Sequence, residues 1–234
     1  MDPSQQPECL TIAAKSSSSV TVILIHGLGG NANEMKVLAQ ELATDPGLNH
    51  VKWVMPQASL QPCTRLGGRV VPAWYDSRSG PDDEEGILQS VETLSRLVRQ
   101  EQEDGTQRVV LAGFSQGANM SLFITVTRPD LKISGVVMLS GRMLLPEKLA
   151  ESMQTSDAKG VPIFISHGMD DEIMTIETNG KCVDALKAAG FTVQKSTNDV
   201  GAISYHVYEG LGHTVDSREK GDLKDWMKKN LSSD

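Results

Sequence analysis

The segment Gly-Phe-Ser-Gln-Gly at residues 113–117 constrains the fold of this chain more than any other. It follows directly on an apolar run at 108–112 and directly precedes a helix-compatible stretch at 118–124, so the sequence predicts a strand, a tight turn and a helix. In such a turn the serine takes a strained backbone conformation, and the glycines let strand and helix approach without a side-chain clash. The five letters alone are a weak signal, but with their flanks they predict that the Ser115 hydroxyl is presented to a substrate.

Apolar runs typical of strands alternate with amphipathic stretches typical of helices along the chain. The predicted strands are 20–25, 51–55, 108–112, 133–139, 161–166, 191–195 and 203–208, and the predicted helices are 31–44, 83–102, 178–189 and 216–230. This alternation predicts an α/β fold with a mostly parallel central sheet and helices on both faces. We expect one domain over residues 20–234, preceded by a flexible N-terminal tail over 1–19, and an irregular, functional loop over 57–81.

Composition and charge argue against several kinds of partner and cofactor. The net charge is −8 and the basic residues are scattered, which argues against nucleic acid as a partner. Cys9, Cys63 and Cys182 are odd in number and far apart, and the sequence has no H-E-x-x-H motif or other ligand cluster, so we expect no disulfide framework, no metal and no other cofactor. With neither an apolar signal-peptide core nor a run long enough to span a membrane, a cytoplasmic setting with at most peripheral membrane contact is favoured.

A candidate base and a candidate acid follow from the chemistry that a serine nucleophile needs. A serine hydroxyl becomes reactive at neutral pH when an imidazole removes its proton and a carboxylate orients that imidazole. Catalytic groups of parallel sheets gather at the carboxyl ends of the strands, which selects His213 after the 203–208 strand and Asp170 or Asp171 after the 161–166 strand. Local chemistry does not separate the two aspartates. The resulting order of serine, aspartate and histidine is typical of α/β-hydrolases.

The other four histidines are expected to have structural roles. His26 and His167 each precede a glycine at a strand end, and because one general base suffices, we expect each to shape its loop through a hydrogen bond. His206 lies inside an alternating strand and His50 just before one, which favours structural or exposed positions.

Two backbone N–H groups are predicted to stabilise the oxyanion of a tetrahedral intermediate. Such donors commonly come from the residue after the nucleophile and from an upstream glycine-rich loop, which here selects Gln116 and Leu28. A glycine-rich loop such as residues 26–30 can also bind phosphate, but no lysine follows it and its spacing matches neither nucleotide-binding fingerprint.

Six ordered motifs resemble those of the acyl-protein thioesterase, carboxylesterase and lysophospholipase family of small α/β-hydrolases, over about residues 20–230. The motifs are His-Gly-Leu-Gly-Gly at 26–30, Ala-Trp-Tyr-Asp at 73–76, Gly-Phe-Ser-Gln-Gly at 113–117, Leu-Ser-Gly at 139–141, His-Gly with an aspartate at 167–171, and Gly-Leu-Gly-His at 210–213. In this family the acid lies three residues after the glycine of the second His-Gly pair, so the resemblance selects Asp171 over Asp170. The chain departs from the family pattern at residues 142–145 and 172–174, and the segment 196–204 is longer than usual.

The resemblance implies a serine hydrolase that cleaves acyl thioesters from S-acylated protein cysteines. Ser115 would carry the acyl group, His213 would act as base and then acid, and Asp171 would orient His213. The alternatives are a carboxylesterase or lysophospholipase that cleaves lipid oxygen esters, and a non-catalytic binding protein on the same fold.

The expected site is open, because residues 142–160 are too few for the large helical cap that many α/β-hydrolases insert at this point. We expect an apolar groove for the acyl chain, with core packing as the alternative role for each candidate residue. The candidates are Leu66, Val71, Trp74 and Leu144, with Leu60, Val70 and Leu145 beside them. S-acylated proteins or lipid esters are the expected partners, and the sequence does not predict an oligomeric state.

Overall fold

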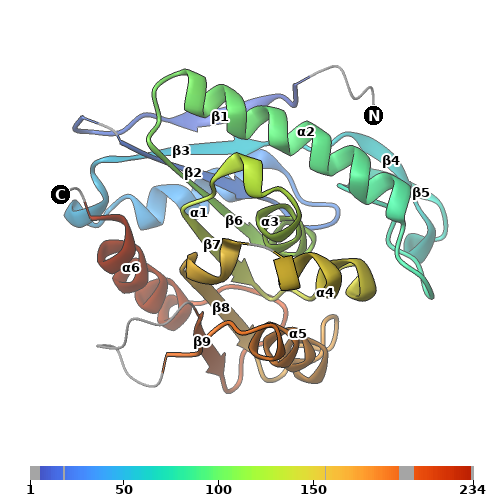
Figure 1. The fold of residues 1–234 in the computed structure, drawn as a ribbon. Coiled ribbons are helices and arrows are strands. Elements are labelled where there is room, and N and C mark those ends of the chain that lie inside the picture. The colour runs from blue at the N-terminus through green and yellow to red at the C-terminus, as the bar shows by residue number, and fades with distance from the viewer. Residues whose placement is uncertain (1–5, 18, 156, 195–202, 233–234) are drawn as a thin grey trace.

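The computed structural model describes residues 6–17, 19–155, 157–194 and 203–232. Its main sheet has the strand order β1-β3-β2-β6-β7-β8-β9, in which only β1 and β3 pair antiparallel (Figure 1). The strands are β1 (Cys9–Ile12), β2 (Val20–Ile25), β3 (Val51–Pro56), β6 (Arg108–Phe114), β7 (Gly135–Leu139), β8 (Ile163–Gly168) and β9 (Ile203–Tyr208). The predicted, mostly parallel sheet is therefore confirmed.

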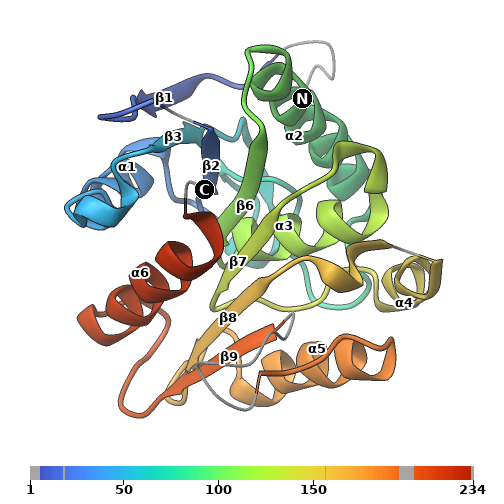
Figure 2. The ribbon, with the colours of Figure 1, turned by 60° about the vertical axis from the view of Figure 1, so that its left-hand side comes forward.

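Helices cover both faces of this sheet (Figure 2). On one face lie α1 (Ala32–Leu42) and α6 (Ser217–Leu231), and on the other α2 (Glu84–Glu103), α3 (Gln116–Thr127), α4 (Pro146–Thr155) and α5 (Ile176–Ala188). Alternate residues of β2 enter two separate cores: Ile23 and Ile25 belong to the core under α2 and α3, and Val22 and Leu24 to the core under α1 and α6. Because both faces of the sheet are covered, its central strands are continuous apolar runs.

The first strand corrects the prediction of a flexible tail over residues 1–19. Cys9–Ile12 pair with β3 in antiparallel register, from Cys9 opposite Pro56 to Ile12 opposite Trp53. Without this strand β3 would be an edge with unpaired backbone N–H and C=O groups, and the pairing with β1 satisfies them.

Two further segments differ from the sequence prediction. Residues 57–81, expected to be irregular, contain an antiparallel hairpin of β4 (Leu60–Cys63) and β5 (Arg69–Pro72). The predicted strand at 191–195 is reduced to an isolated bridge between Val193 and Ile203, and Lys195 lies outside the described residues. Residues 196–202, which belong to the segment 196–204 expected to be longer than usual, also lie outside the described residues.

The connection over residues 142–160 contains α4 and a 3-10 turn at Asp157–Gly160, and the described part of it builds no large cap over the sheet. Other 3-10 turns lie at Pro46–Leu48, Thr64–Leu66 and Pro129–Leu131. None of the helices in the described ranges has both the length and the apolar character needed to cross a membrane.

A buried carboxyl group joins α6 to the sheet. Glu219 is fully buried, and its Oε1 accepts a hydrogen bond from the Ser166 hydroxyl on β8 at 2.5 Å. Its Oε2 has no partner among the described residues. Burial raises the pKa of Glu219 from 4.5 to about 7, although the Ser166 hydrogen bond opposes this rise.

We predict that Glu219 makes the stability of the fold depend on pH. The pKa of Glu219 is higher in the folded state than in the unfolded chain. Its favourable contribution to the unfolding free energy is therefore complete below about pH 4.5 and is lost as the pH rises through about 7. Relative to Glu219→Gln, the wild type should lose on the order of 2 kcal/mol of unfolding free energy between pH 5 and 8. Urea denaturation of both proteins across this range measures the difference, and parallel stability curves would contradict the prediction.

Candidate active site

Ser115 lies on a strained turn between β6 and α3. Its φ of 53° and ψ of −115° are unusual for a residue with a side chain. The turn requires glycine on both sides: a Cβ atom at Gly113 would lie 2.2 Å from the carbonyl carbon of Gly117, and one at Gly117 would lie 2.0 Å from the Ile25 carbonyl oxygen. The strand, turn and helix predicted around Ser115 are therefore present, and the start of α3 lies against the end of β2.

The loop after β2 approaches Ser115 closely. A Cβ atom at Gly27 would lie 3.1 Å from the Ser115 Cβ. The Ala58 N–H donates to His26 Nε2 at 3.0 Å, so Nδ1 carries the ring proton and donates to the Gly27 carbonyl oxygen at 2.7 Å. Burial lowers the pKa of His26, so the ring stays neutral. His26 shapes its loop through a hydrogen bond, as the sequence predicts.

This arrangement sets the direction of the Leu28 N–H group. The peptide between Gly27 and Leu28 is trans, so its N–H points away from the carbonyl oxygen that His26 holds. The N–H of Gln116 belongs to the first residue of α3 and has no acceptor within the helix. Leu28 and Gln116 line the same cavity, and within the described residues neither backbone N–H is hydrogen-bonded. Two N–H groups are thus available to bind an anionic oxygen.

His213 is paired with Asp171 and not with Asp170. Its Nδ1 donates to Asp171 Oδ2 at 2.6 Å, and the Asp171 side chain is fully buried. The other oxygen of Asp171 accepts the backbone N–H groups of Ile173 at 2.9 Å and Met174 at 2.8 Å. These donors fix the orientation of the buried carboxylate, and the carboxylate in turn fixes the orientation of the His213 ring.

One cavity of about 1010 Å³ brings Ser115 and His213 together with Leu28 and Gln116. Its wall also contains Leu66, Tyr75, Asp82, Phe114, Arg142, Leu145, Ile173 and Met174. Within the described part of the chain no hydrogen bond joins Ser115 to His213; such bonds often tighten only when substrate binds. The described residues include no group of three or more His, Cys, Asp or Glu side chains that could hold a metal ion.

The apolar groove predicted from sequence is largely wrong. Of the seven candidates only Leu66 and Leu145 line the cavity. Trp74 and Leu144 are 1% and 0% exposed and belong to the core, and Val71 lies outside the cavity wall. Trp74 is held because its indole N–H donates to the His26 carbonyl at 2.9 Å and its backbone N–H donates to the Gln116 side chain at 3.1 Å.

An ion pair that sequence reasoning missed forms part of the cavity wall. The Arg142 guanidinium donates two hydrogen bonds to the Asp82 carboxylate, one at 2.5 Å and one at 3.3 Å, and Asp82 also accepts the Leu145 N–H at 2.9 Å. Burial opposes the charged form, but the Arg142 hydrogen bonds and charge lower the pKa of Asp82. The only sequence signal was the departure from the family pattern at residues 142–145.

A second serine, histidine and aspartate lie together on β9 and α6. The distance from Ser204 Oγ to His206 Nε2 is 2.8 Å, and His206 Nδ1 lies 3.4 Å from Asp222 Oδ2. None of the three lines the cavity, and Ser204 lies within an extended strand, not on a strained turn. The cavity, the turn and the free N–H groups therefore favour Ser115 as the candidate nucleophile.

Comparisons with known proteins find similar sequences and similar folds. A family model described as phospholipase/carboxylesterase matches residues 7–231. Acyl-protein thioesterase 1 from Yarrowia lipolytica is 32% identical over 94% of this chain and 96% of its own length, and its Saccharomyces cerevisiae namesake is 32% identical over 96% and 99%. The crystal structure of Zea mays acyl-protein thioesterase 2 superposes with a TM-score of 0.83 at 26% identity, covering 97% of this chain and all of the other.

We predict that Gly117→Ala destabilises the fold by more than about 3 kcal/mol, because the added methyl group has no space beside the Ile25 carbonyl. Gly221→Ala is the matched control, since Gly221 lies in α6 with no atom within 4 Å of the added Cβ. It should stabilise the protein by up to about 1 kcal/mol. Urea denaturation midpoints measure both effects, and similar midpoints would contradict the close approach of α3 to β2.

Proposed function

The chain belongs to the phospholipase/carboxylesterase family, and on this basis we propose that it cleaves long-chain acyl thioesters from S-acylated protein cysteines. It is a hydrolase of acyl esters or thioesters, as the family and the thioesterase relatives indicate. One observation carries the proposal of mechanism. One cavity is lined by a serine on a strained turn, by a histidine bound to a buried carboxylate, and by two residues whose backbone N–H groups have no acceptor in the described part of the chain.

In the proposed reaction Ser115 Oγ attacks the carbonyl carbon of the thioester while His213 Nε2 takes the hydroxyl proton. The negative charge on the carbonyl oxygen is stabilised by the N–H groups of Leu28 and Gln116. Collapse of this intermediate breaks the carbon–sulfur bond, and His213 returns its proton to the departing cysteine thiolate. Water then attacks the acyl-enzyme by the same steps, releasing the fatty acid and regenerating the Ser115 hydroxyl.

Asp171 supports this cycle by stabilising the imidazolium that forms on His213. Its Oδ2 lies 2.6 Å from His213 Nδ1, so the ring presents Nε2 to the cavity. The carboxylate is already held by the Ile173 and Met174 N–H groups, so it need not reorient when the charge on His213 appears.

Access and cavity lining support an acylated protein as substrate. The described connection over 142–160 forms no large cap, so a cysteine on another protein can reach Ser115. Leu66, Leu145 and Ile173 offer apolar contacts to a chain in a cavity of about 1010 Å³. Relatives from Yarrowia lipolytica and Saccharomyces cerevisiae are named acyl-protein thioesterases.

A second candidate function is cleavage of lipid oxygen esters, such as those of lysophospholipids. The observation that favours it is the presence of Arg65 and Arg78 on the cavity wall, since guanidinium groups bind a phosphate headgroup. The proposed residues act on either leaving group.

We infer a cytoplasmic setting with at most peripheral membrane contact. Cys9, Cys63 and Cys182 are all free thiols, which agrees with a reducing compartment. A net charge of −8 argues against a nucleic-acid partner.

The test compares wild type, Ser115→Ala and Ser204→Ala. Wild type and Ser204→Ala should each gain one fluorophosphonate adduct and release a long-chain acyl group from an S-acylated peptide. Ser115→Ala should gain no adduct and lose at least about 1000-fold in kcat. Ser204 is the matched control because its hydroxyl also contacts a histidine. Retained turnover in Ser115→Ala would contradict the mechanism.

Rates on the S-acylated peptide and on a lysophospholipid, measured on one preparation, separate the two candidate substrates. Higher kcat/KM for the thioester is expected, and a preference for the lysophospholipid would assign the protein to oxygen esters. Turnover of either substrate without any fluorophosphonate adduct on the protein would contradict Ser115 as the nucleophile.

A further inference from the structure

His167 is a buried histidine beside the Asp171–His213 pair that the proposed reaction does not use. It is the penultimate residue of β8, and its side chain is fully buried. Its Nε2 lies 2.5 Å from the Met174 carbonyl oxygen and 3.5 Å from Asp171 Oδ2. The hydrogen bond to Met174 spans seven residues and closes the loop that carries Asp171.

Met174 is therefore held through both of its backbone polar groups. Its N–H donates to Asp171 Oδ1 at 2.8 Å, and its C=O accepts from His167. The Ile173 N–H donates to the same Asp171 oxygen at 2.9 Å, while the other oxygen binds His213 at 2.6 Å. The hydrogen bonds run in one chain, from His167 through Met174 and Asp171 to His213.

The protonation state of His167 follows from its partners. The Met174 carbonyl only accepts hydrogen bonds, so Nε2 carries the proton, and Nδ1 has no partner among the described residues. Burial lowers the pKa of His167; Asp171 and His213 are the ionisable groups that act on it, the first raising and the second lowering that pKa. The ring is neutral, so His213 is the histidine left to form a full ion pair with Asp171.

We propose that His167 is a positioning residue of this site, whose bond to the Met174 carbonyl fixes the 171–174 turn and so holds Asp171 against His213. This role rests on the proposed function, because it acts through His213 as the general base. If the ring N–H of His167 is removed, the Met174 carbonyl loses its hydrogen bond and the 171–174 turn is free to move. The two N–H groups that bind Asp171 then move with the turn, and the carboxylate loses its fixed orientation.

The test uses His167→Phe, which keeps a ring of similar shape but no donor, and His167→Gln, whose amide nitrogen reaches the position of Nε2. His167→Phe should lower kcat about 10- to 100-fold with little change in KM. The acid limb of its kcat/KM profile should move to lower pH by about half a unit or more, because the imidazolium of His213 is less well stabilised. His167→Gln should stay within about threefold of wild type.

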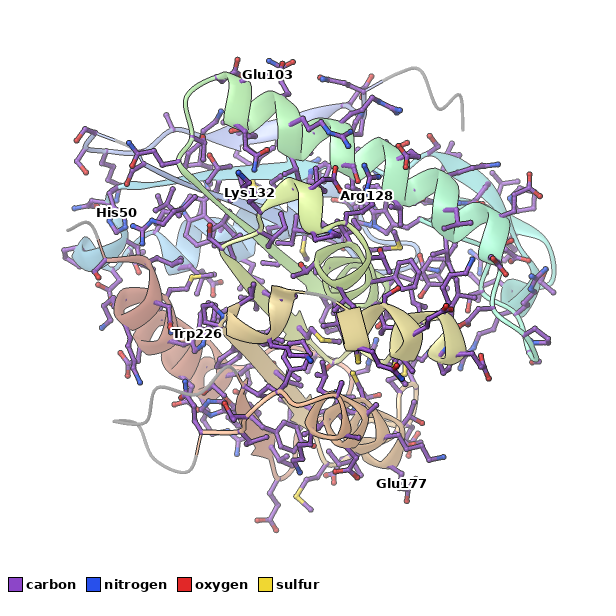
Figure 3. The ribbon with its side chains drawn as sticks, viewed as in Figure 1. His50, Glu103, Arg128, Lys132, Glu177 and Trp226 are labelled. Atoms are coloured by element: carbon purple, nitrogen blue, oxygen red, sulfur yellow. The ribbon has the colours of Figure 1, made fainter. Side chains whose placement is uncertain are left out.

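A matched control comes from His50, another buried histidine whose ring is bonded to a backbone carbonyl, from Nε2 to Leu231 at 2.6 Å. Figure 3 shows His50 near the end of α6, far from Glu177 at the start of α5. His50→Phe should lose stability in the same way but keep kcat and the acid limb unchanged. All rates are expressed per active site, titrated with a fluorophosphonate.

The inference is overturned if His167→Phe, per titrated site, keeps the kcat and the acid limb of His167→Gln, since a merely structural role would lower only stability. If His167→Phe does not fold, His167→Asn replaces it, because its shorter amide does not reach the Met174 carbonyl, and the same outcomes apply. Failure of the proposed function is recognised separately, because Ser115→Ala would then keep its turnover.

Discussion

The contact between the start of α3 and the end of β2 is the constraint on which the rest of the site depends. Gly117 touches the Ile25 carbonyl so closely that no side chain fits. This contact brings Ser115 and the Gln116 N–H, from one strand-helix turn, beside the loop that carries the Leu28 N–H. One close contact between a helix and a strand therefore positions both the candidate nucleophile and its candidate oxyanion donors. The free-energy cost of the backbone strain at Ser115 is offset by the packing of the two cores on either side of the sheet.

Two His-Gly pairs, at residues 26–27 and 167–168, lie at the carboxyl ends of strands and make the same kinds of contact. In each pair the histidine ring holds a carbonyl of its own loop: His26 holds Gly27, and His167 holds Met174. In each pair the glycine leaves room for a neighbour. Gly27 faces Ser115, and a Cβ atom at Gly168 would lie 2.1 Å from the Leu211 carbonyl oxygen, in the loop that leads to His213. Burial lowers the pKa of both rings. Neither ring therefore places a second positive charge beside Asp171 when the imidazolium forms on His213.

The sequence predicted the parts of the molecule that local pattern determines. Continuous apolar runs placed the central strands, and the rule that functional groups gather at their carboxyl ends selected His213 and the two aspartates. The choice of Asp171 needed either the family resemblance or the structure, because only the turn at 173–174 shows which carboxylate is held. The groove was predicted wrongly because an apolar side chain such as Trp74 or Leu144 has the same pattern whether it lines a cavity or fills a core. The Arg142–Asp82 pair joins residues 60 apart, so no local pattern reports it.

Two of the segments that the sequence analysis sets apart from the family pattern, residues 142–145 and 172–174, contribute to the cavity wall. Residues 142–145 contribute the Arg142 ion pair and Leu145, and residues 172–174 contribute Ile173 and Met174. The same segments also support the proposed chemistry, since the N–H groups of Ile173 and Met174 bind Asp171 and the Arg142 N–H binds Asn119 in α3. Backbone N–H groups of these segments bind the carboxylate of Asp171 and the side chain of Asn119, and residues of the same segments line the cavity. A change of an apolar side chain such as Leu145 or Ile173 would therefore alter the lining of the cavity and leave these backbone hydrogen bonds in place.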